Sequence, residues 1–289
     1  MPPFHEQIRL PKAPPTAAPV FVRWLGTAGY SIRAGDHVLL FDPYLTRASL
    51  ARCAFGTLVP DAAVVTRHVG RADAIVVGHT HFDHVLDVPL LARTTGARVL
   101  GSSSAAVLCR ADAVPPSQIV DVEGALRKGT FETEIGPFKL RFFPSAHARL
   151  VLGRVPAAGE IADCDEVPRS AGGYRCGAVF AVEVEVHGRT FFHLGSAELV
   201  EESLPVRNVD TLFFTVAGWT KGRDVPERVM SRLSPKRIAL GHWDDFFRPL
   251  DAELRALPAL GLPRLLDRFA AASRDTQVGT LPLLEEVAL

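Results

Sequence analysis

Residues 78–84 read Gly-His-Thr-His-Phe-Asp-His, which places three histidines and one aspartate within six residues at the end of a short apolar run. The apolar run is typical of a central strand. Alternate residues of an extended segment point to the same side, so His79 and His81 are expected to face one cation together. Asp83 and His84 come where the chain turns into the next helix, from which they can reach the same cavity. Imidazole and carboxylate ligands suit zinc, iron or manganese, and the stretch therefore predicts a metal site.

Strand-like and helix-like runs alternate outward from this stretch. Strands followed by helices, twice over, favour an α/β fold in which two mixed β-sheets pack back to back with helices on the outer faces, an αββα sandwich. The expected strands cover Val20–Leu25, Tyr30–Arg33, Val38–Phe41, Ala74–Val77, Arg98–Leu100, Phe138–Phe143, Val179–Val186, Thr190–His193, Thr211–Val216 and Arg237–Leu240. The expected helices cover His84–Thr95, Ala105–Arg110, Pro226–Leu233 and Asp251–Leu260.

Three segments fall outside this pattern. Residues 1–19 are rich in proline, and we expect a flexible arm there, before a single domain over residues 20–289. Two loop insertions, near 51–71 and 150–175, are irregular and rich in glycine, proline and arginine. Long irregular loops in a compact domain are usually functional or partly disordered. The alternative is that both are surface excursions without a role.

The overall charge limits the classes of partner. The 289 residues carry 32 Lys and Arg against 32 Asp and Glu, so the formal net charge is zero, which argues against a nucleic-acid partner. No run approaches the roughly 18 apolar residues of a membrane span, and the N-terminal residues lack the apolar stretch of a signal peptide. We therefore expect a cytoplasmic protein with a small-molecule substrate, and a homo-oligomer is possible. Cys164 and Cys176 could approach each other, and whether they pair stays open.

The histidine stretch resembles the metallo-β-lactamase superfamily, and the resemblance runs from about Val20 to the last predicted helix. The family implies an αββα sandwich with one or two metal ions at the edge of the two sheets. Asp42, in Leu-Leu-Phe-Asp-Pro, matches a family aspartate that is not itself a metal ligand but orients one of the ligand side chains. His147, in Phe-Pro-Ser-Ala-His, and His242, in Leu-Gly-His-Trp-Asp-Asp-Phe, match the later ligands. By this resemblance the first metal would be held by His79, His81 and His147, and the second by Asp83, His84 and His242.

One position departs from the family pattern. The family places a bridging aspartate after a glycine in the second half, whereas Gly195 is followed here by Ser196. A protonated serine is a poor ligand and brings no negative charge. Glu198 could replace the aspartate, or a water or hydroxide alone could bridge the ions. His193, on the preceding strand, could be a ligand or support one, although a buried core histidine is the alternative.

The expected reaction is hydrolysis. A metal with an open position lowers the pKa of its bound water to about 7 and supplies hydroxide, which Asp83 would position. We therefore predict a metal-dependent hydrolase that uses a metal-bound hydroxide to cleave a lactone, carboxylic ester or phosphodiester. The cofactor would be one or two Zn²⁺ ions, with Mn²⁺ or Fe as alternatives. Competing hypotheses are a mononuclear iron oxidoreductase of the sulfur-dioxygenase kind and a non-catalytic metal-binding protein.

Within the superfamily, one branch is most similar in three stretches of sequence. The ascorbate-phosphate lactonase-like and phospholipase D-like branch resembles this chain in Leu-Gly-Thr-Ala-Gly, Phe-Asp-Pro and His-Trp-Asp-Asp-Phe.

Candidate substrate contacts come from the loops. Trp219 and Lys221 follow a strand that should end near the site, and Trp243 and Arg248 follow His242. Many arginines lie in the strand-end segments and insertions, and cations at the mouth would favour an anionic substrate. The alternatives are that these arginines are solvated and that aromatic residues form an apolar wall. The arginines are Arg47, Arg52, Arg67, Arg71, Arg149, Arg154, Arg169 and Arg175; the aromatic residues are Phe55, Trp219, Trp243, Phe246 and Phe247.

Overall fold

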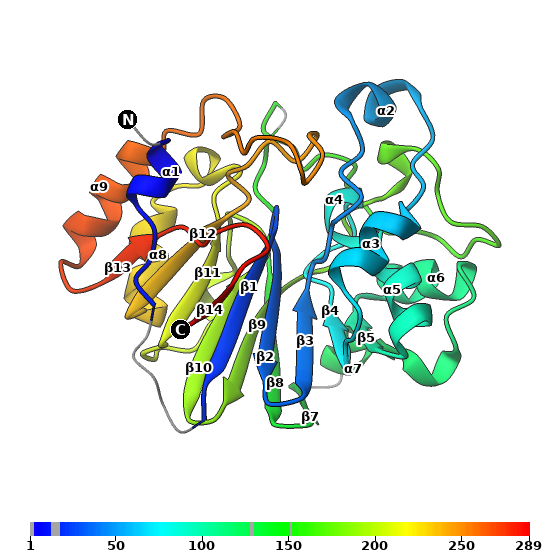
Figure 1. Cartoon of the computed structure of the whole chain (residues 1–289), viewed down its shortest axis with the longest axis horizontal. Coiled ribbons are helices and arrows are strands. Elements are labelled where there is room, and N and C mark those ends of the chain that lie inside the picture. Colours follow the sequence, from blue (N-terminus) through cyan, green and yellow to red (C-terminus); the bar gives the residue numbers. More distant parts are fainter. Residues whose placement is uncertain (1–2, 13–17, 128–129, 151) are drawn as a thin grey trace.

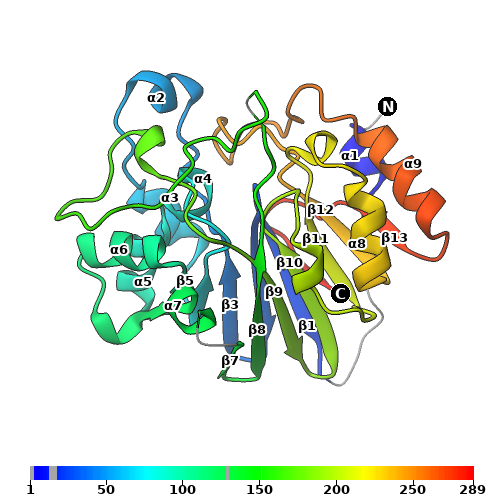
Figure 2. The ribbon, with the colours of Figure 1, turned by 180° about the vertical axis from the view of Figure 1, so that it is seen from behind.

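The computed structural model describes residues 3–12, 18–127, 130–150 and 152–289. In this part of the chain, two sheets of seven strands each form the middle of the molecule. Helices cover both outer faces, as Figure 1 and the view from behind in Figure 2 show. Apolar side chains from both sheets fill the space between them; the rings of Tyr30 and Phe213, one from each sheet, stack at 4.2 Å. The predicted αββα sandwich is confirmed.

The first sheet is antiparallel at one edge and parallel at the other. Its first half is a meander through tight glycine turns, and its second half is built from strand–helix units. Its order is β14 (Glu286–Ala288), β1 (Val20–Gly26), β2 (Gly29–Ala34), β3 (His37–Phe41), β4 (Ala74–Val76), β5 (Arg98–Gly101) and β6 (Ile119–Asp121).

The second sheet repeats this plan. Strands β10 to β13 are parallel to one another, while β7 to β10 pair antiparallel. The valines of the alternating run in β9 enter the core. The order is β13 (Gln277–Gly279), β12 (Arg237–Gly241), β11 (Thr211–Thr215), β10 (Arg189–Leu194), β9 (Val179–Val186), β8 (Phe138–Ser145) and β7 (Phe131–Ile135).

The helices are short and begin or end at recognisable signals. The Ser102 hydroxyl accepts a hydrogen bond from Ala105 N at the start of one helix, and Gly96 ends another in the left-handed conformation. None of the described helices is long and apolar enough to cross a membrane. They are α1 (Phe4–Gln7), α2 (Leu50–Phe55), α3 (Ala62–His68), α4 (Phe82–Val85), α5 (Val88–Thr95), α6 (Ser103–Ala111), α7 (Val122–Leu126), α8 (Val225–Leu233) and α9 (Leu262–Ala272).

Two predicted helices are placed differently in the structure. The helix expected over His84–Thr95 is two helices, α4 and α5, because Pro89 has no N–H to donate to the carbonyl four residues earlier. The helix expected over Asp251–Leu260 is wrong. Leu257 N donates instead to Trp243 O at 2.8 Å, which holds this segment extended, and the last helix is α9.

The expected arm and insertions also differ from the structure. Residues 3–12 of the expected flexible arm pack on the domain: α1 lies there, Leu10 is buried, and Leu10 N donates to Thr280 O at 2.9 Å. Residues 13–17 lie outside the described part. The 51–71 insertion contains most of α2 and all of α3, and Leu58 N donates to Arg169 O at 2.8 Å, which joins the two insertions. All four cysteines are free, with Cys164 exposed and Cys176 buried.

Candidate metal centre

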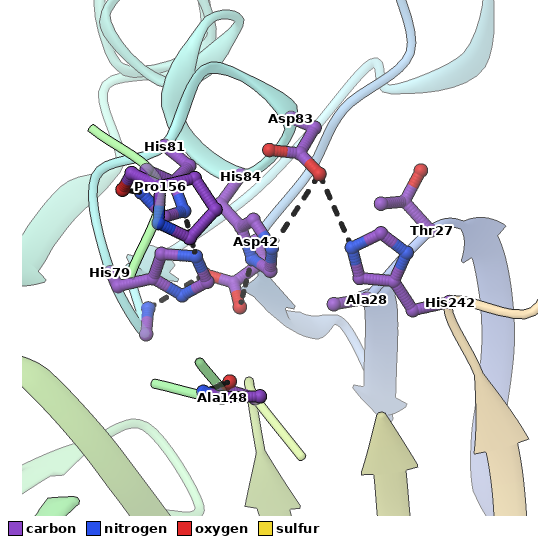
Figure 3. Close-up of polar contacts among 12 residues, drawn as sticks. Thr27, Ala28, Asp42, His79, His81, Asp83, His84, Ala148, Pro156 and His242 are labelled. Atoms are coloured by element: carbon purple, nitrogen blue, oxygen red, sulfur yellow. Dashed lines mark hydrogen bonds and ion pairs between the residues drawn. The ribbon is translucent and has the colours of Figure 1, made fainter. Parts of the chain in front are cut away.

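The strand ends of both sheets meet at one edge of the sandwich. Asp42 follows β3, the residues from His79 to His84 follow β4, and His242 follows β12. His147 comes two residues after the end of β8, a strand that runs in the same direction as β10. Figure 3 shows side chains from the first sheet and from β12 pointing into one space. The structure thus brings together all six residues that the resemblance implies as ligands.

His79, His81 and His147 form the first donor group. One nitrogen of each ring lies within 4.8 Å of the others, and His79 Nε2 is 3.0 Å from His81 Nδ1. The far nitrogens of two rings have backbone partners: His81 Nε2 donates to Pro156 O at 2.8 Å, and His147 Nδ1 donates to Ala148 O at 2.7 Å. These hydrogen bonds select the tautomers that leave His81 Nδ1 and His147 Nε2 free to bind an ion.

Burial keeps the first donor group neutral. It lowers the pKa of His79 well below the ordinary value, and the surrounding imidazoles lower it further. Burial, together with His81, lowers the pKa of His147 to about 4. Burial also lowers the pKa of His81. Neutral imidazoles carry the lone pairs that a metal ion requires, so protons compete weakly for these ligands near neutral pH.

Asp83, His84 and His242 form the second donor group, whose donor atoms also lie within 4.8 Å of one another. Asp83 Oδ2 is 3.2 Å from His242 Nε2 and 3.9 Å from His84 Nε2. Burial opposes the charge on Asp83, but His84 and His242 outweigh it and hold the pKa of the carboxyl well below its usual range. Burial lowers the pKa of His84, but Asp42 and Asp83 outweigh it and raise the pKa overall.

Asp42 is enclosed behind the two donor groups. Its Oδ1 accepts a hydrogen bond from Gly78 N at 2.6 Å, and its Oδ2 is 3.0 Å from His84 Nδ1. A Cβ at Gly78 would lie 2.8 Å from Asp42 Oδ2, too close unless the carboxylate moves, and a Cβ at Gly195 would make a tight contact with the same atom at 3.0 Å. His193 belongs to neither donor group. Its Nε2 donates to Ala28 O at 3.1 Å and lies 3.7 Å from Asp42 Oδ2, which makes it a core residue packed behind Asp42.

The two donor groups fit the metal ions that the family implies. Three imidazoles converge in one group, and a carboxylate converges with two imidazoles in the other, which is a nitrogen and oxygen set typical of zinc, manganese or iron. All of these residues except His147 are buried. A divalent ion would therefore meet donors that are already assembled and oriented.

Glu198 does not supply the missing bridging carboxylate. It pairs with Ala146 across a β-bridge, and its Oε1 accepts hydrogen bonds from Arg228 Nη1 at 2.8 Å and Leu199 N at 3.1 Å. The side chain is therefore directed to α8. Ser196 lines the cavity, and its hydroxyl accepts a hydrogen bond from Ala148 N at 3.1 Å. Among the described residues that line the cavity, Asp83 is the only carboxylate.

We expect Ser196→Asp to strengthen binding of the second ion, because it adds a negative charge to the cavity that both donor groups line. The affinity for the second ion should rise at least about tenfold, since each tenfold step needs only about 1.4 kcal/mol. Calorimetric titration of metal-free protein with Zn²⁺ measures this. Ser196→Asn is the uncharged control of equal size and should leave the affinity unchanged. Equal affinities in both variants would show that this site needs no bridging carboxylate.

The donor groups form the floor of a cavity of about 530 Å³. Its walls come from the end of β11, from the segment after β12 and from the 150–175 insertion, so this insertion takes part in the site. The residues that line it are His79, His81, Phe82, Asp83, His84, His147, Leu150, Pro156, Ala157, Ala171, Gly172, Gly195, Ser196, Thr215, Ala217, His242, Phe246, Phe247 and Leu257.

None of the four residues expected as substrate contacts lines this cavity. Trp219 is buried and donates to Leu260 O at 2.6 Å, and Trp243 stacks on Trp24 at 5.1 Å. Lys221 is exposed and does not line the cavity, and Arg248 lines a separate small cavity. Phe246 and Phe247 do line the cavity, whereas Phe55 is exposed.

A buried network that the sequence analysis missed holds His242. This residue has a positive φ of 55°, and its N–H donates to Thr27 O at 2.6 Å. Thr27 N donates in turn to Asp244 Oδ1 at 3.0 Å. Arg47 Nη2 is 2.6 Å from Asp244 Oδ2, and each side chain of this ion pair is 3% exposed. The available signals were Asp244 itself, two residues after the histidine, and Thr27 inside the Leu-Gly-Thr-Ala-Gly stretch.

Comparisons with known proteins agree with this geometry. The chain is 34% identical over 119 residues to a UPF0173 metal-dependent hydrolase of Cupriavidus necator, a match that covers 40% of this chain and 38% of the relative. The chain thus spans less than two fifths of that relative's length. It is 25% identical over 236 residues to a UPF0173 metal-dependent hydrolase of Anaeromyxobacter sp. strain K, covering 78% of this chain and 75% of the relative.

A solved structure and a family model extend the comparison. The fold is similar to that of an isothiocyanate hydrolase from Delia radicum gut bacteria, with a TM-score of 0.54 and 13% identity over 93% of this chain and 99% of the other. The family model described as the beta-lactamase superfamily domain matches residues 37–245. Because this match covers well over half of the sequence and includes both donor groups, the chain belongs to the metallo-β-lactamase superfamily.

Proposed function

We propose that this chain is a metal-dependent hydrolase of a lactone, carboxylic ester or phosphodiester, and that its two donor groups each hold a divalent ion. The observation that carries the proposal is the convergence of both groups on the floor of one open cavity. Zn²⁺ suits these donors best, and Mn²⁺ or Fe would use the same residues. The UPF0173 relatives are named metal-dependent hydrolases, which supports the same reaction class.

The chain's own residues position the reactants. When bound, the ions would lower the pKa of a coordinated water to about 7 and polarise a substrate oxygen. Asp83 stays ionised beside His242, so its carboxylate can accept a hydrogen bond from the attacking water and orient it.

Other residues hold these groups in place. Asp42 faces Nδ1 of His84, which fixes the ring so that Nε2 is directed to Asp83. Pro156 O orients His81 in the same way. Leu150 and Phe247 add apolar surface to the cavity lining, and an apolar lining strengthens the charge interactions near it.

Metal content and turnover test this proposal together. We expect untagged protein to contain about two zinc or manganese ions per chain by elemental analysis, because two complete donor groups are present. A fluorogenic panel of lactones, esters and phosphodiesters should identify the bond that is cleaved. Removal of the metal with a chelator should abolish turnover, and Zn²⁺ or Mn²⁺ should restore it.

Three outcomes would contradict the proposal. Protein that binds no metal even after incubation with Zn²⁺ and Mn²⁺ would exclude a metal-dependent reaction. A single iron per chain, with no hydrolysis of any panel compound, would indicate oxygen chemistry instead. Bound zinc without turnover would favour a non-catalytic metal-binding protein.

A further inference from the structure

The cavity above the donor groups has apolar walls. Beyond the proposed ligands, the largest side chains that line it are Phe82, Leu150, Phe246, Phe247 and Leu257. The polar side chains in the walls are the hydroxyls of Ser196 and Thr215. The Ser196 hydroxyl already accepts a hydrogen bond from Ala148 N. Among the described residues that line the cavity there is no lysine and no arginine.

Three arginines of the surrounding segments are engaged outside the cavity lining. Arg47 is buried in its ion pair with Asp244, and Arg228 binds the Glu198 carboxylate. Arg175 donates to Ala158 O at 3.0 Å, outside the cavity lining. A phosphate or carboxylate on the part of the substrate that fills the cavity would therefore lose its hydration and gain no cationic partner from the walls. Such a loss is costly for a charged group.

From this lining we infer that the part of the substrate beyond the bond that is cleaved is uncharged and apolar. The substrate class is a neutral ester or lactone with an alkyl or aryl group. This inference rests on the proposed hydrolase function and narrows its substrate. It also replaces the anionic substrate expected from the arginines of the loops. An apolar group in this cavity would be removed from water against aromatic and aliphatic side chains, which favours binding.

Leu257 is the wall position best suited to a test. It is half-buried, so a longer side chain there can reach the cavity without displacing the core. Its backbone is fixed, because Leu257 N donates to Trp243 O at 2.8 Å. Leu152 provides the matched control: it is 96% exposed and does not line the cavity. Leu257→Arg and Leu152→Arg therefore make the same chemical change inside and outside the site.

Binding can be measured without turnover. Octanohydroxamic acid and suberic acid monohydroxamate carry the same metal-binding head on chains of equal length, and only the second ends in a carboxylate. We expect zinc-loaded protein to bind the octanoyl compound at least about a hundredfold more tightly by calorimetry, because the walls provide no partner for the charge. Leu257→Arg should reduce this preference to less than about tenfold, while Leu152→Arg should leave it unchanged.

Turnover provides the second measurement. We expect kcat/KM to be higher for the neutral ester 4-nitrophenyl butyrate than for the carboxylate-bearing ester mono-4-nitrophenyl succinate, in line with the hydroxamate affinities. Bis(4-nitrophenyl) phosphate serves as the anionic diester in this comparison. Equal or tighter binding of the carboxylate-ended hydroxamate, or binding of neither compound, would overturn the inference. A strong preference for the octanoyl compound without hydrolysis of any ester would instead refute the proposed function and leave the apolar cavity as a binding site.

Discussion

His147→Ala is expected to abolish binding at the first donor group and to lower kcat/KM by at least about a thousandfold, equal to about 4 kcal/mol of transition-state stabilisation. The group contains three imidazoles, and the loss of one leaves an ion with only two protein ligands. His147 is half-buried at the edge of the cavity, so its removal leaves a smaller void than the loss of the buried His79. Elemental analysis and steady-state kinetics measure both effects.

A loss of activity alone would not distinguish a missing ligand from a misfolded protein. Circular dichroism and the melting temperature of the metal-free forms should match those of the unchanged protein. His187→Asn removes an exposed histidine at the turn between β9 and β10 and should alter neither metal content nor rate. A full metal complement in the His147→Ala protein would show that His147 is not a ligand.

Arg47→Met is expected to lower the free energy of unfolding by about 3–5 kcal/mol, the usual cost of breaking a buried ion pair by removing one partner. The Asp244 carboxylate would remain 3% exposed and without its cation. Because Asp244 also accepts the N–H of Thr27, and Thr27 O holds His242, the second donor group should weaken as well. Urea unfolding of the metal-free protein and zinc titration measure the two effects separately.

A double variant separates charge from packing in this network. Arg47→Met with Asp244→Asn removes both charges, while the amide oxygen of asparagine can still accept the Thr27 N–H. Most of the lost stability should return, since replacing both partners of a buried pair is often neutral. If Arg47→Met alone unfolds at the same urea concentration as the unchanged protein, the ion pair contributes nothing to the fold.

Local patterns in the sequence predict the sandwich and four of the six residues that the structure brings together as donors. Residues 78–84 place four donors in one stretch, so local spacing alone indicates metal binding. His147 and His242 are isolated histidines, and only the family resemblance singled them out. The structure brings them together because strands from both sheets end at the same edge. The narrower assignment to the lactonase-like and phospholipase D-like branch stays a prediction.

Directions of side chains in irregular segments were not predictable. Trp243 and Arg248 lie close to His242 in the sequence, yet neither lines the cavity. The positive φ of His242 and the extended segment at Leu257 depend on contacts with Thr27 and Trp243, which spacing cannot encode. Glu198 likewise pairs with an arginine of α8, a helix that lies later in the sequence.

Both donor groups combine residues from two distant parts of the chain. His79 and His81 come from the first sheet and His147 from the second; Asp83 and His84 come from the first sheet and His242 from the second. An ion in either group would therefore act as a cross-link between the two halves of the sandwich. Because each donor group is complete only when the two halves are together, the binding energy of the ion would stabilise the assembled sandwich. Neither half alone would bind the ion with the full donor group. Metal loading would then also mark the completion of folding.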